Sequence, residues 1–433
     1  MPATTAQRTA LPTTLPHSST EARERRKSLA LIGRIFAFAV IAVAIVRLAP
    51  AISFDQIHND FSHYYIGGWL LANGQNVYTT SLEPFCAEMG VAYDPTIPYA
   101  AHPPLILAWF SLFSVFSIKV AYGLWLVCQL AFAGGFIEIT RRILRYRWNN
   151  PFWLLSIGIY CNSLSFQLLF YYSQVQLAVG ILIYAAIHAD QKQRHTLACC
   201  FITIASAVKI YPVVLAPWFF FRNLKTFRNA AVRIGAMAIT SVGCLALPGF
   251  GTWHDFVNLG VPTLAGNATK WCNYSLQNLV CMLSKAQQVA TGIPLGDIEA
   301  PKMLASVLAV FAVAVCYLVA LKNRRQPLVA ISLLLCVTMY CGIITWSHYL
   351  TVLLLPLALL FKTAREAKNT PEQLVALCLG ILILTPKIDF AFFEAFHWNN
   401  LRILAHFYPL YIAAAVVALL ARRTADSEDA AIE

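Results

Sequence analysis

One short segment of the sequence combines an acidic residue with aromatic neighbours. Asp60 is followed within ten residues by Tyr64, Tyr65 and Trp69. A carboxylate can accept a proton from a hydroxyl group, and aromatic rings can stack on the face of a sugar. The segment could therefore bind and activate a carbohydrate. The same residue types are also typical of a solvated loop acid beside an interfacial aromatic belt, and this alternative stays open.

A second candidate is Lys209, which lies in the otherwise apolar stretch of residues 207–212. A charged lysine in such an apolar stretch costs free energy unless a group of opposite charge lies beside it. A lipid phosphate would be such a group. The alternative is a lysine whose ammonium group simply reaches the membrane interface. Weaker candidates mark the ends of apolar segments: His102 before two prolines, Ser173 to Gln176, Asn273 to Asn278, and His348-Tyr349.

The elements that position these residues are apolar helices. The chain has 433 residues, of which 59% are hydrophobic and 12% charged, and its mean hydropathy is +0.62. Soluble proteins carry about twice as many charged residues. The apolar runs, such as Ile331 to Trp346, are continuous rather than alternating, which excludes a barrel. The sequence predicts an all-α, polytopic membrane protein.

The distribution of charge gives the orientation. The net charge of +12 comes from short basic clusters between apolar runs, which is typical of cytoplasmic loops and argues against nucleic-acid binding. Residues 53–102 contain five acidic residues and no Lys or Arg, so we expect this segment on the external side. Residues 1–28 are predicted to be a disordered cytoplasmic tail. The run from Leu29 to Ile52 is interpreted as an uncleaved first span, with a transit peptide as the alternative.

The organisation that follows is a single membrane domain over residues 29–422, with a cytoplasmic tail at 423–433. Its external loops are expected at about 53–102, 249–301 and 387–402, the first two being large. Residues 103–117 are interpreted as a short arm that does not cross, because otherwise the basic residues 141–147 would lie outside. This leaves about twelve crossings, each of roughly 20 residues, and places both termini inside.

The twelve cysteines lie mostly inside apolar runs and show no zinc-ligand spacing. Cys86 and Cys272 fall in the expected external loops, where a disulfide between them is left open.

Taken in order, the motifs resemble glycosyltransferase family 87, the polyprenol-phosphate-sugar-dependent membrane enzymes of the GT-C type. The resemblance covers roughly residues 30 to 420 and is carried by Asp60-Phe61 with Tyr64-Tyr65, Gly74 to Tyr78, Pro103-Pro104-Leu105, Trp125, Gln174, Lys209-Tyr211-Pro212 with Arg222, Asn273-Ser275-Leu276, His348-Tyr349 and Leu355-Pro356. Two positions depart from the family pattern: His102 stands where the family usually has tyrosine, and Ser173 where it usually has glycine.

The resemblance implies single-displacement transfer, with inversion, of a hexose from a polyprenyl-phosphate donor to a glycolipid or lipoglycan on the external face of the cell membrane. Asp60 would be the catalytic base. The donor phosphate would be bound by Lys209, Tyr211 and His348. Substrate-binding residues would be Tyr64, Tyr65, His102, Gln174, Asn273 and Gln277. No cofactor is expected, and no residue is assigned as a metal ligand. Since a monophosphate leaving group carries less charge than a nucleotide diphosphate, a divalent metal ion is plausible but unnecessary.

Mannose is the favoured sugar, followed by arabinofuranose or another lipid-linked pentose. Two other classes of function stay open on the sequence alone. A transporter would place polar residues at the middle of the membrane, between repeated halves. A non-catalytic lipid-binding protein would share the same hydropathy.

Overall fold

The computed structural model describes residues 17–52, 57, 59–95, 97–266, 273, 275–291, 299–342 and 344–366, and this part consists of helices joined by turns and loops. Within these residues the only β pairing is an isolated bridge between Asn273 and Trp346. The longer helices are α1 (His17–Leu48), α2 (Asn59–Ala72), α5 (Ile118–Leu144), α6 (Pro151–Asn162), α8 (Gln176–Gln191), α9 (His195–Val208), α11 (Phe227–Ala246), α14 (Leu276–Thr291), α15 (Glu299–Lys322), α16 (Pro327–Cys341) and α17 (Leu354–Glu366).

The boundaries of these helices follow local sequence signals. Pro151 occupies the first turn of α6, and the side chain of Asn150 caps the helix by accepting hydrogen bonds from the backbone of residues 152 and 153. Ser163 separates α6 from α7 (Leu164–Tyr171), and the axes of the two helices are bent by 54° relative to each other. Ser173 and Gln174 lie in the turn between α7 and α8, and Lys209 lies between α9 and the 3-10 helix η2 (Tyr211–Leu215).

Four described helices are long and apolar enough to cross a membrane, and the bent pair α6 and α7 would make a fifth. The four are Leu31–Leu48, Ile118–Leu144, Phe227–Ala246 and Ala300–Lys322. Many large apolar side chains on α1, α11 and α15 are exposed, as expected of helices that face lipid. The helix α4 (Pro104–Phe110) is only about 10 Å long at 1.5 Å per residue, so the interpretation of 103–117 as a short arm agrees with the structure.

Two expectations need correction. The first helix begins at His17 rather than near Leu29, because residues 21–27 are nearly all good helix formers, and part of the expected disordered tail is therefore helical. The segments expected as external loops also contain helices: α2 (Asn59–Ala72), α3 (Glu83–Met89), α12 (Phe250–Asp255), the π-helix η3 (Phe256–Gly260), α13 (Val261–Gly266) and α14. The segments 373–386, 387–402, 403–421 and 423–433 lie outside the described residues.

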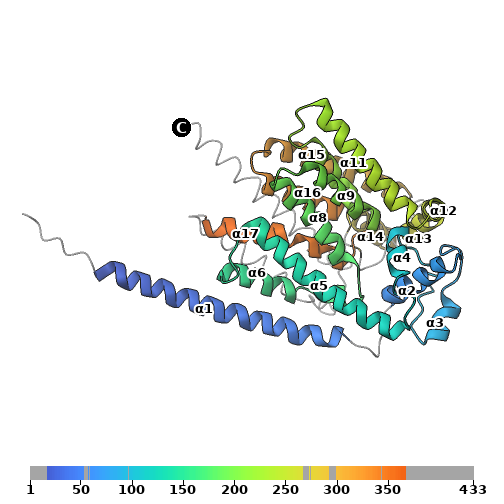
Figure 1. Ribbon diagram of the computed structural model, residues 1–433, viewed down its shortest axis with the longest axis horizontal. Helices are drawn as coiled ribbons and strands as arrows, with labels where there is room; N and C mark the ends of the chain where they lie inside the picture. Colours follow the sequence, from blue (N-terminus) through green and yellow to red (C-terminus); the bar gives the residue numbers. More distant parts are fainter. Residues whose placement is uncertain are drawn as a thin grey trace, which may run out of the picture.

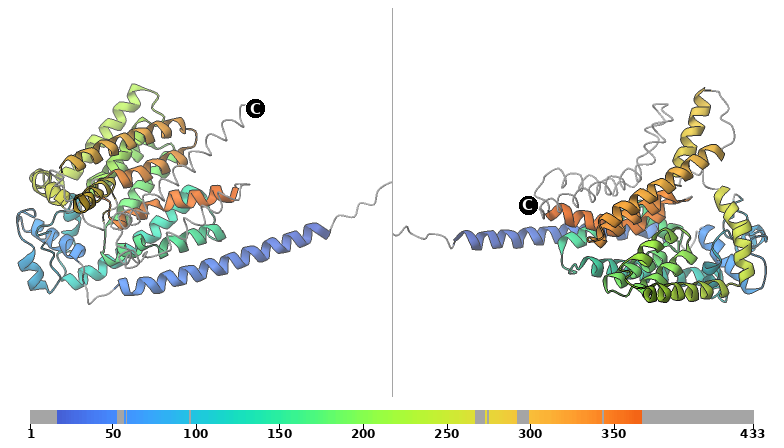
Figure 2. Two further views of the ribbon diagram at one scale, coloured as in Figure 1. Left: turned by 180° about the vertical axis from the view of Figure 1, so that it is seen from behind. Right: turned by 90° about the horizontal axis from the view of Figure 1, so that it is seen from above.

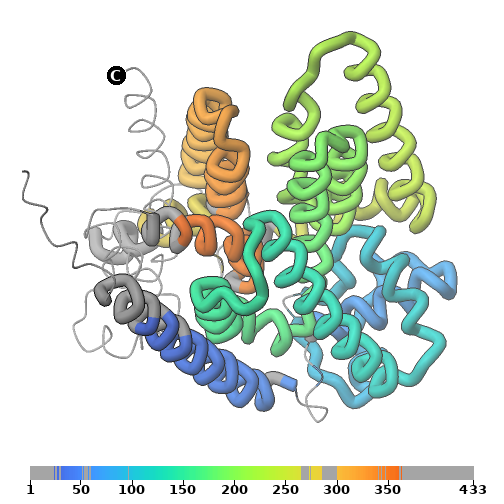
Figure 3. Tube along the Cα trace, turned by 60° about the vertical axis from the view of Figure 1, so that its left-hand side comes forward, coloured from blue at the N-terminus to red at the C-terminus, as the bar shows by residue number. Residues whose placement is uncertain are grey.

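The helices from the expected external segments gather at one end of the molecule. Figure 1 shows α2, α3, α4, α12 and α13 together at the right, where α5 begins. Figure 2 shows α1 lying along one side of the bundle, where it packs against α6. In Figure 3, α15 and α16 (orange) form a pair on one flank, and α9 and α11 (greens) form a pair on the other.

The core beneath α2 is aromatic and tightly packed. The rings of Phe61 and Tyr122 lie 5.1 Å apart, and those of Phe110 and Trp125 lie 4.8 Å apart. A Cβ atom at Gly68 would lie 2.6 Å from the carbonyl carbon of Phe110, so glycine is required where α2 approaches α4. This close packing fixes the orientation of α2 and of the acidic residue at its start.

Candidate active site

The amide of Gln174 lies at the centre of a polar cluster formed by four separate segments. Its Nε2 donates a hydrogen bond of 2.5 Å to Oδ2 of Asp60, in the first turn of α2. Its Oε1 accepts hydrogen bonds from the hydroxyl of Tyr64, at 2.9 Å, and from Nζ of Lys209, at 3.2 Å. The amide N–H of Gln174 therefore faces the carboxylate, and its amide oxygen faces the ammonium. The two charged groups are linked through this one side chain.

The loop that carries Gln174 is held from behind by α5. Nε1 of Trp125 donates to the carbonyl of Ser173 at 2.8 Å, and Nε2 of Gln129 donates to the carbonyl of Gln174 at 3.0 Å. Ser173 is fully buried and has a φ of 53°, a left-handed conformation that glycine adopts more readily. A glycine at this position would adopt the same conformation without strain.

Lys209 is buried at the end of α9, with 8% of its surface exposed. Its ammonium lies 4.0 Å from the ring centre of Tyr349, in a cation–π contact. The ring of Tyr349 is 5.5 Å from that of Tyr211, whose hydroxyl accepts a 2.5 Å hydrogen bond from Nε2 of Gln176. Aromatic groups and an amide thus surround the ammonium, and the carboxylate of Asp60 is the opposite charge near it.

Three buried histidines flank the cluster. The ring of His102 lies 4.3 Å from that of Tyr64, and the ring of His348 lies 4.9 Å from that of Tyr349. Nε2 of both, and both ring nitrogens of His63, are buried without a hydrogen-bond partner in the described part of the chain. These nitrogen atoms are hydrogen-bonding groups that the described part of the chain leaves unused.

The ionisation of the groups outside the membrane-spanning helices follows from burial. Burial lowers the pKa of His63 to about 4, against a smaller opposing effect of Asp94. Burial, with His63 and Lys209 nearby, holds the pKa of His102 well below its usual range. Burial and the charge of Asp60 raise the pKa of Tyr64 far above its usual value. At neutral pH both histidines are neutral and the phenol keeps its proton.

Three of the predicted site residues are not brought into this cluster. The hydroxyl of Tyr65 donates to the carbonyl of Phe116 at 2.6 Å. Oδ1 of Asn273 accepts from the backbone N–H of Ser275 and of Thr345, which ties two loops together. Gln277 lies half-buried on α14.

The remaining predicted residues, Asp60, Tyr64, His102, Gln174, Lys209, Tyr211 and His348, do lie within or beside the cluster. Among the residues that the structure describes, no three His, Cys, Asp or Glu side chains could together hold a metal ion. Cys86 is buried in α3, while Cys272 lies outside the described residues, so the question of a disulfide between them stays open.

Tyr349 and Gln176 belong to the weaker candidate segments of the sequence but were given no role there, although both stand next to residues that were. Tyr349 follows His348 directly, and Gln176 lies two positions after Gln174. The signal that could have found Tyr349 is the need of a buried ammonium for an aromatic partner. For Gln176 the signal is the polar pair at the start of an otherwise apolar helix.

This arrangement suits the transfer of a group between two oxygen atoms. A half-buried carboxylate can accept the proton of an attacking hydroxyl. A positioned ammonium can stabilise a departing anion, such as a phosphate. The carboxylate of Asp60 and the ammonium of Lys209 lie on opposite sides of the Gln174 amide.

Comparison with known proteins gives the family. No curated protein matches the sequence. A family model described as glycosyltransferase family 87 matches residues 100–356, which is more than half of the chain. The match contains Gln174, Lys209 and Tyr349, and the structure adds Asp60 from outside it. The chain therefore belongs to glycosyltransferase family 87 and is a membrane glycosyltransferase.

Proposed function

We propose that the protein transfers a hexose, mannose in the first place, from a polyprenyl-phosphate donor to a glycolipid or lipoglycan acceptor. The reaction is a single displacement with inversion at the anomeric carbon. Asp60 accepts the proton of the acceptor hydroxyl as its oxygen attacks that carbon. The bond to the lipid phosphate breaks, and Lys209 stabilises the departing phosphate.

The observation that carries this proposal is the link from Asp60 through Gln174 to Lys209. Asp60 comes from a segment without basic residues, and Lys209 from the end of an apolar helix, yet one amide contacts both. A base and a cation on either side of one centre are what a displacement with an anionic leaving group requires. The exposed apolar helices supply lipid-facing surface near which a polyprenyl tail would lie.

The other residues take supporting roles in this proposal. Tyr211 and His348 contact the donor phosphate together with Lys209. Tyr64, His102 and Gln174 contact the sugar or the acceptor. Tyr65, Asn273 and Gln277 are assigned to substrate binding on the resemblance alone, at a greater distance from the cluster.

The architecture that we propose is of the GT-C type, with about twelve membrane helices of roughly 20 residues each. Residues 29–422 form the single catalytic domain, and residues 423–433 a cytoplasmic tail. The active site lies on the external face of the cell membrane, because Asp60 belongs to the base-free segment 53–102. The reaction needs no cofactor, and a divalent metal ion is not required because Lys209 supplies positive charge to the departing phosphate.

The test is sugar transfer by the purified protein in detergent. The donor is radiolabelled polyprenyl-phosphate mannose, and the acceptors are a panel of membrane glycolipids. Asp60→Asn and Lys209→Gln are each expected to abolish transfer. Glu88→Gln is the matched control, because Glu88 is an exposed acid in the same external segment.

The outcomes separate the parts of the proposal. Normal transfer by Asp60→Asn would refute the role of the base. Transfer only from polyprenyl-phosphate pentoses would change the sugar and keep the mechanism. Failure to bind or use any lipid-phosphate sugar would refute the donor class.

A further inference from the structure

A basic cavity lies at the other end of the bundle, where the C-terminal ends of α5 and α8 meet. It has a volume of about 580 Å3, and Arg142, Arg145, Tyr146, His188 and Lys192 are part of its wall. Nδ1 of His188 is buried and has no hydrogen-bond partner in the described part of the chain. The cavity therefore offers both positive charge and an unused polar atom.

Part of the positive charge around the cavity is already neutralised. Glu138 contacts Nε of Arg141 at 2.7 Å and Nε of Arg142 at 2.5 Å. Arg141 also donates to the carbonyl of Tyr146 at 2.7 Å. These contacts fix Arg141 and leave only the outer part of Arg142 for a ligand.

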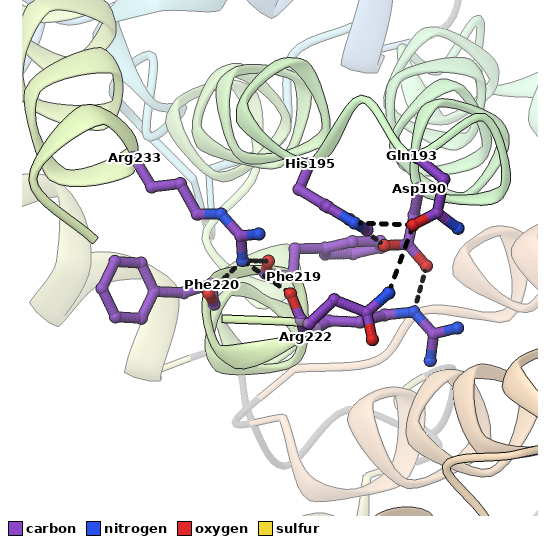
Figure 4. A network of polar contacts seen from close by, with 8 residues as sticks. Asp190, Gln193, His195, Phe219, Phe220, Arg222 and Arg233 are labelled. Carbon is purple, nitrogen blue, oxygen red and sulfur yellow. Dashed lines mark hydrogen bonds and ion pairs between the residues drawn. The ribbon is translucent and has the colours of Figure 1, made fainter. Parts of the chain in front are cut away.

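The carboxylate of Asp190, near the end of α8, is also engaged. Figure 4 shows Asp190 between His195, at 2.7 Å, and Arg222, at 2.6 Å. No carboxylate among the described residues forms an ion pair with Arg145 or Lys192. These two cations on the wall of the cavity are therefore available to an anion.

An apolar cavity adjoins the basic one. It has a volume of about 390 Å3 and shares Arg145 and Gln191 with it. Its wall includes Leu144 at the end of α5, Leu328 at the start of α16 and Leu359 in the middle of α17. The two cavities together combine an anion-binding region with a space for an alkyl chain.

This pair of cavities is separate from the candidate active site. Two hydrogen bonds connect α5 to the two ends of α8. Just before the start of α8, Gln129 of α5 donates to the carbonyl of Gln174, and at the end of α8, Gln191 donates to the carbonyl of Ile143 of α5 at 3.2 Å. The two helices thus run side by side between the two places. From Gln176 to Gln191 is about 22 Å at 1.5 Å per residue.

We propose that the two cavities bind one anionic phospholipid of the cytoplasmic leaflet. Its phosphate contacts Arg145, Lys192 and the outer part of Arg142, and one acyl chain enters the apolar cavity beside Leu328. Basic pockets between membrane helices on the cytoplasmic side are suited to lipid headgroups because they match the charge of that leaflet. The cytoplasmic side follows from the basic clusters at this end. This inference does not depend on the sugar, the donor or the catalytic residues proposed above.

The test measures lipid binding to the intact protein in detergent by native mass spectrometry. Phosphatidylglycerol is the anionic probe, phosphatidylcholine the zwitterionic one, and inorganic phosphate the soluble one. The double variant Arg145→Gln/Lys192→Gln is expected to bind phosphatidylglycerol about 30-fold more weakly, at roughly tenfold per 1.4 kcal/mol and about 1 kcal/mol per basic residue. The control Arg147→Gln/Arg194→Gln removes the same charge from two exposed neighbours that do not line the cavities.

A second variant tests the apolar part. Leu328→Trp fills the space beside the headgroup and is expected to weaken lipid binding while its melting temperature stays close to that of the wild type. Equal losses in the cavity variant and the charge control would overturn the proposal. So would equal binding of phosphatidylcholine, or displacement of the lipid by inorganic phosphate, which would indicate a soluble phosphate as the occupant.

Discussion

Replacing Gln174 by leucine tests whether the amide links the base to the cation. The change removes the donor to Asp60 and the acceptor for Lys209 while keeping a side chain of similar size. A hydrogen bond to a charged group contributes about 1.5–3 kcal/mol. If one such bond acts in the transition state, kcat falls about 10- to 150-fold, at 1.36 kcal/mol per tenfold.

The assay is sugar transfer at saturating donor, with kcat and KM determined separately. Gln174→Glu is expected to lose at least as much activity, because it replaces the donor to Asp60 by a second acceptor. The control is Gln167→Leu on α7, where the side chain makes a single long hydrogen bond of 3.4 Å. A Gln174→Leu protein with an unchanged melting temperature and a kcat within twofold of the wild type would refute the reasoning.

The remaining predictions concern stability. His63 is neutral when buried, with a pKa of about 4 against about 6.5 in the unfolded chain, so its contribution is complete above pH 6.5 and is lost as the pH falls towards 4. Thermal unfolding at pH 5 should show a loss of about 2 kcal/mol relative to pH 7.5, which His63→Gln removes. Ser173→Gly should unfold at the same or a higher temperature, whereas Ser173→Val should lose about 1–2 kcal/mol, because only glycine adopts the left-handed conformation without strain. Asn273→Ala should lose about 1–3 kcal/mol and speed proteolysis, since it leaves the buried N–H of Thr345 without an acceptor.

Each of these has a contradicting result. Equal acid sensitivity of His63→Gln and the wild type would show that other groups dominate. Equal melting temperatures of the glycine and valine variants at position 173 would mean that the backbone there is not strained. An unchanged proteolysis rate for Asn273→Ala would show that the two loops are held together by other contacts.

Hydropathy predicted most helix positions, because a spanning helix must be apolar along its length. It did not predict the helices of the external segments, such as α2 and α14. Those helices are short or mixed in composition, and packing rather than hydropathy stabilises them. The same limit explains why the start of α1 at His17 was not predicted. Hydropathy marks where a helix enters lipid and carries no information on the polar helical turns that precede that point.

Charged residues of the site were easier to find than neutral ones. Lys209 stands out because a charge in an apolar segment costs free energy unless it is paired. Asp60 stands out because it lies in a segment that contains no basic residue. Gln174 and Tyr349 carry no such cost, so their central position could only come from the structure. Asn273 was expected to contact substrate, but its side chain joins backbone groups, a role that a polar residue can take without any signature in the sequence.

The wide spacing of the site along the chain has a consequence for biosynthesis. Roughly 290 residues separate Asp60 from Tyr349, and a ribosome adds about 5–20 residues per second, so the last contact of the cluster is made some 15 to 60 s after the first residue emerges. Until then the ammonium of Lys209 has no aromatic partner at this position. A nascent chain, or one truncated before Tyr349, therefore holds an incomplete centre, so the proposed enzyme is not expected to use its lipid donor before most of the chain has been inserted into the membrane.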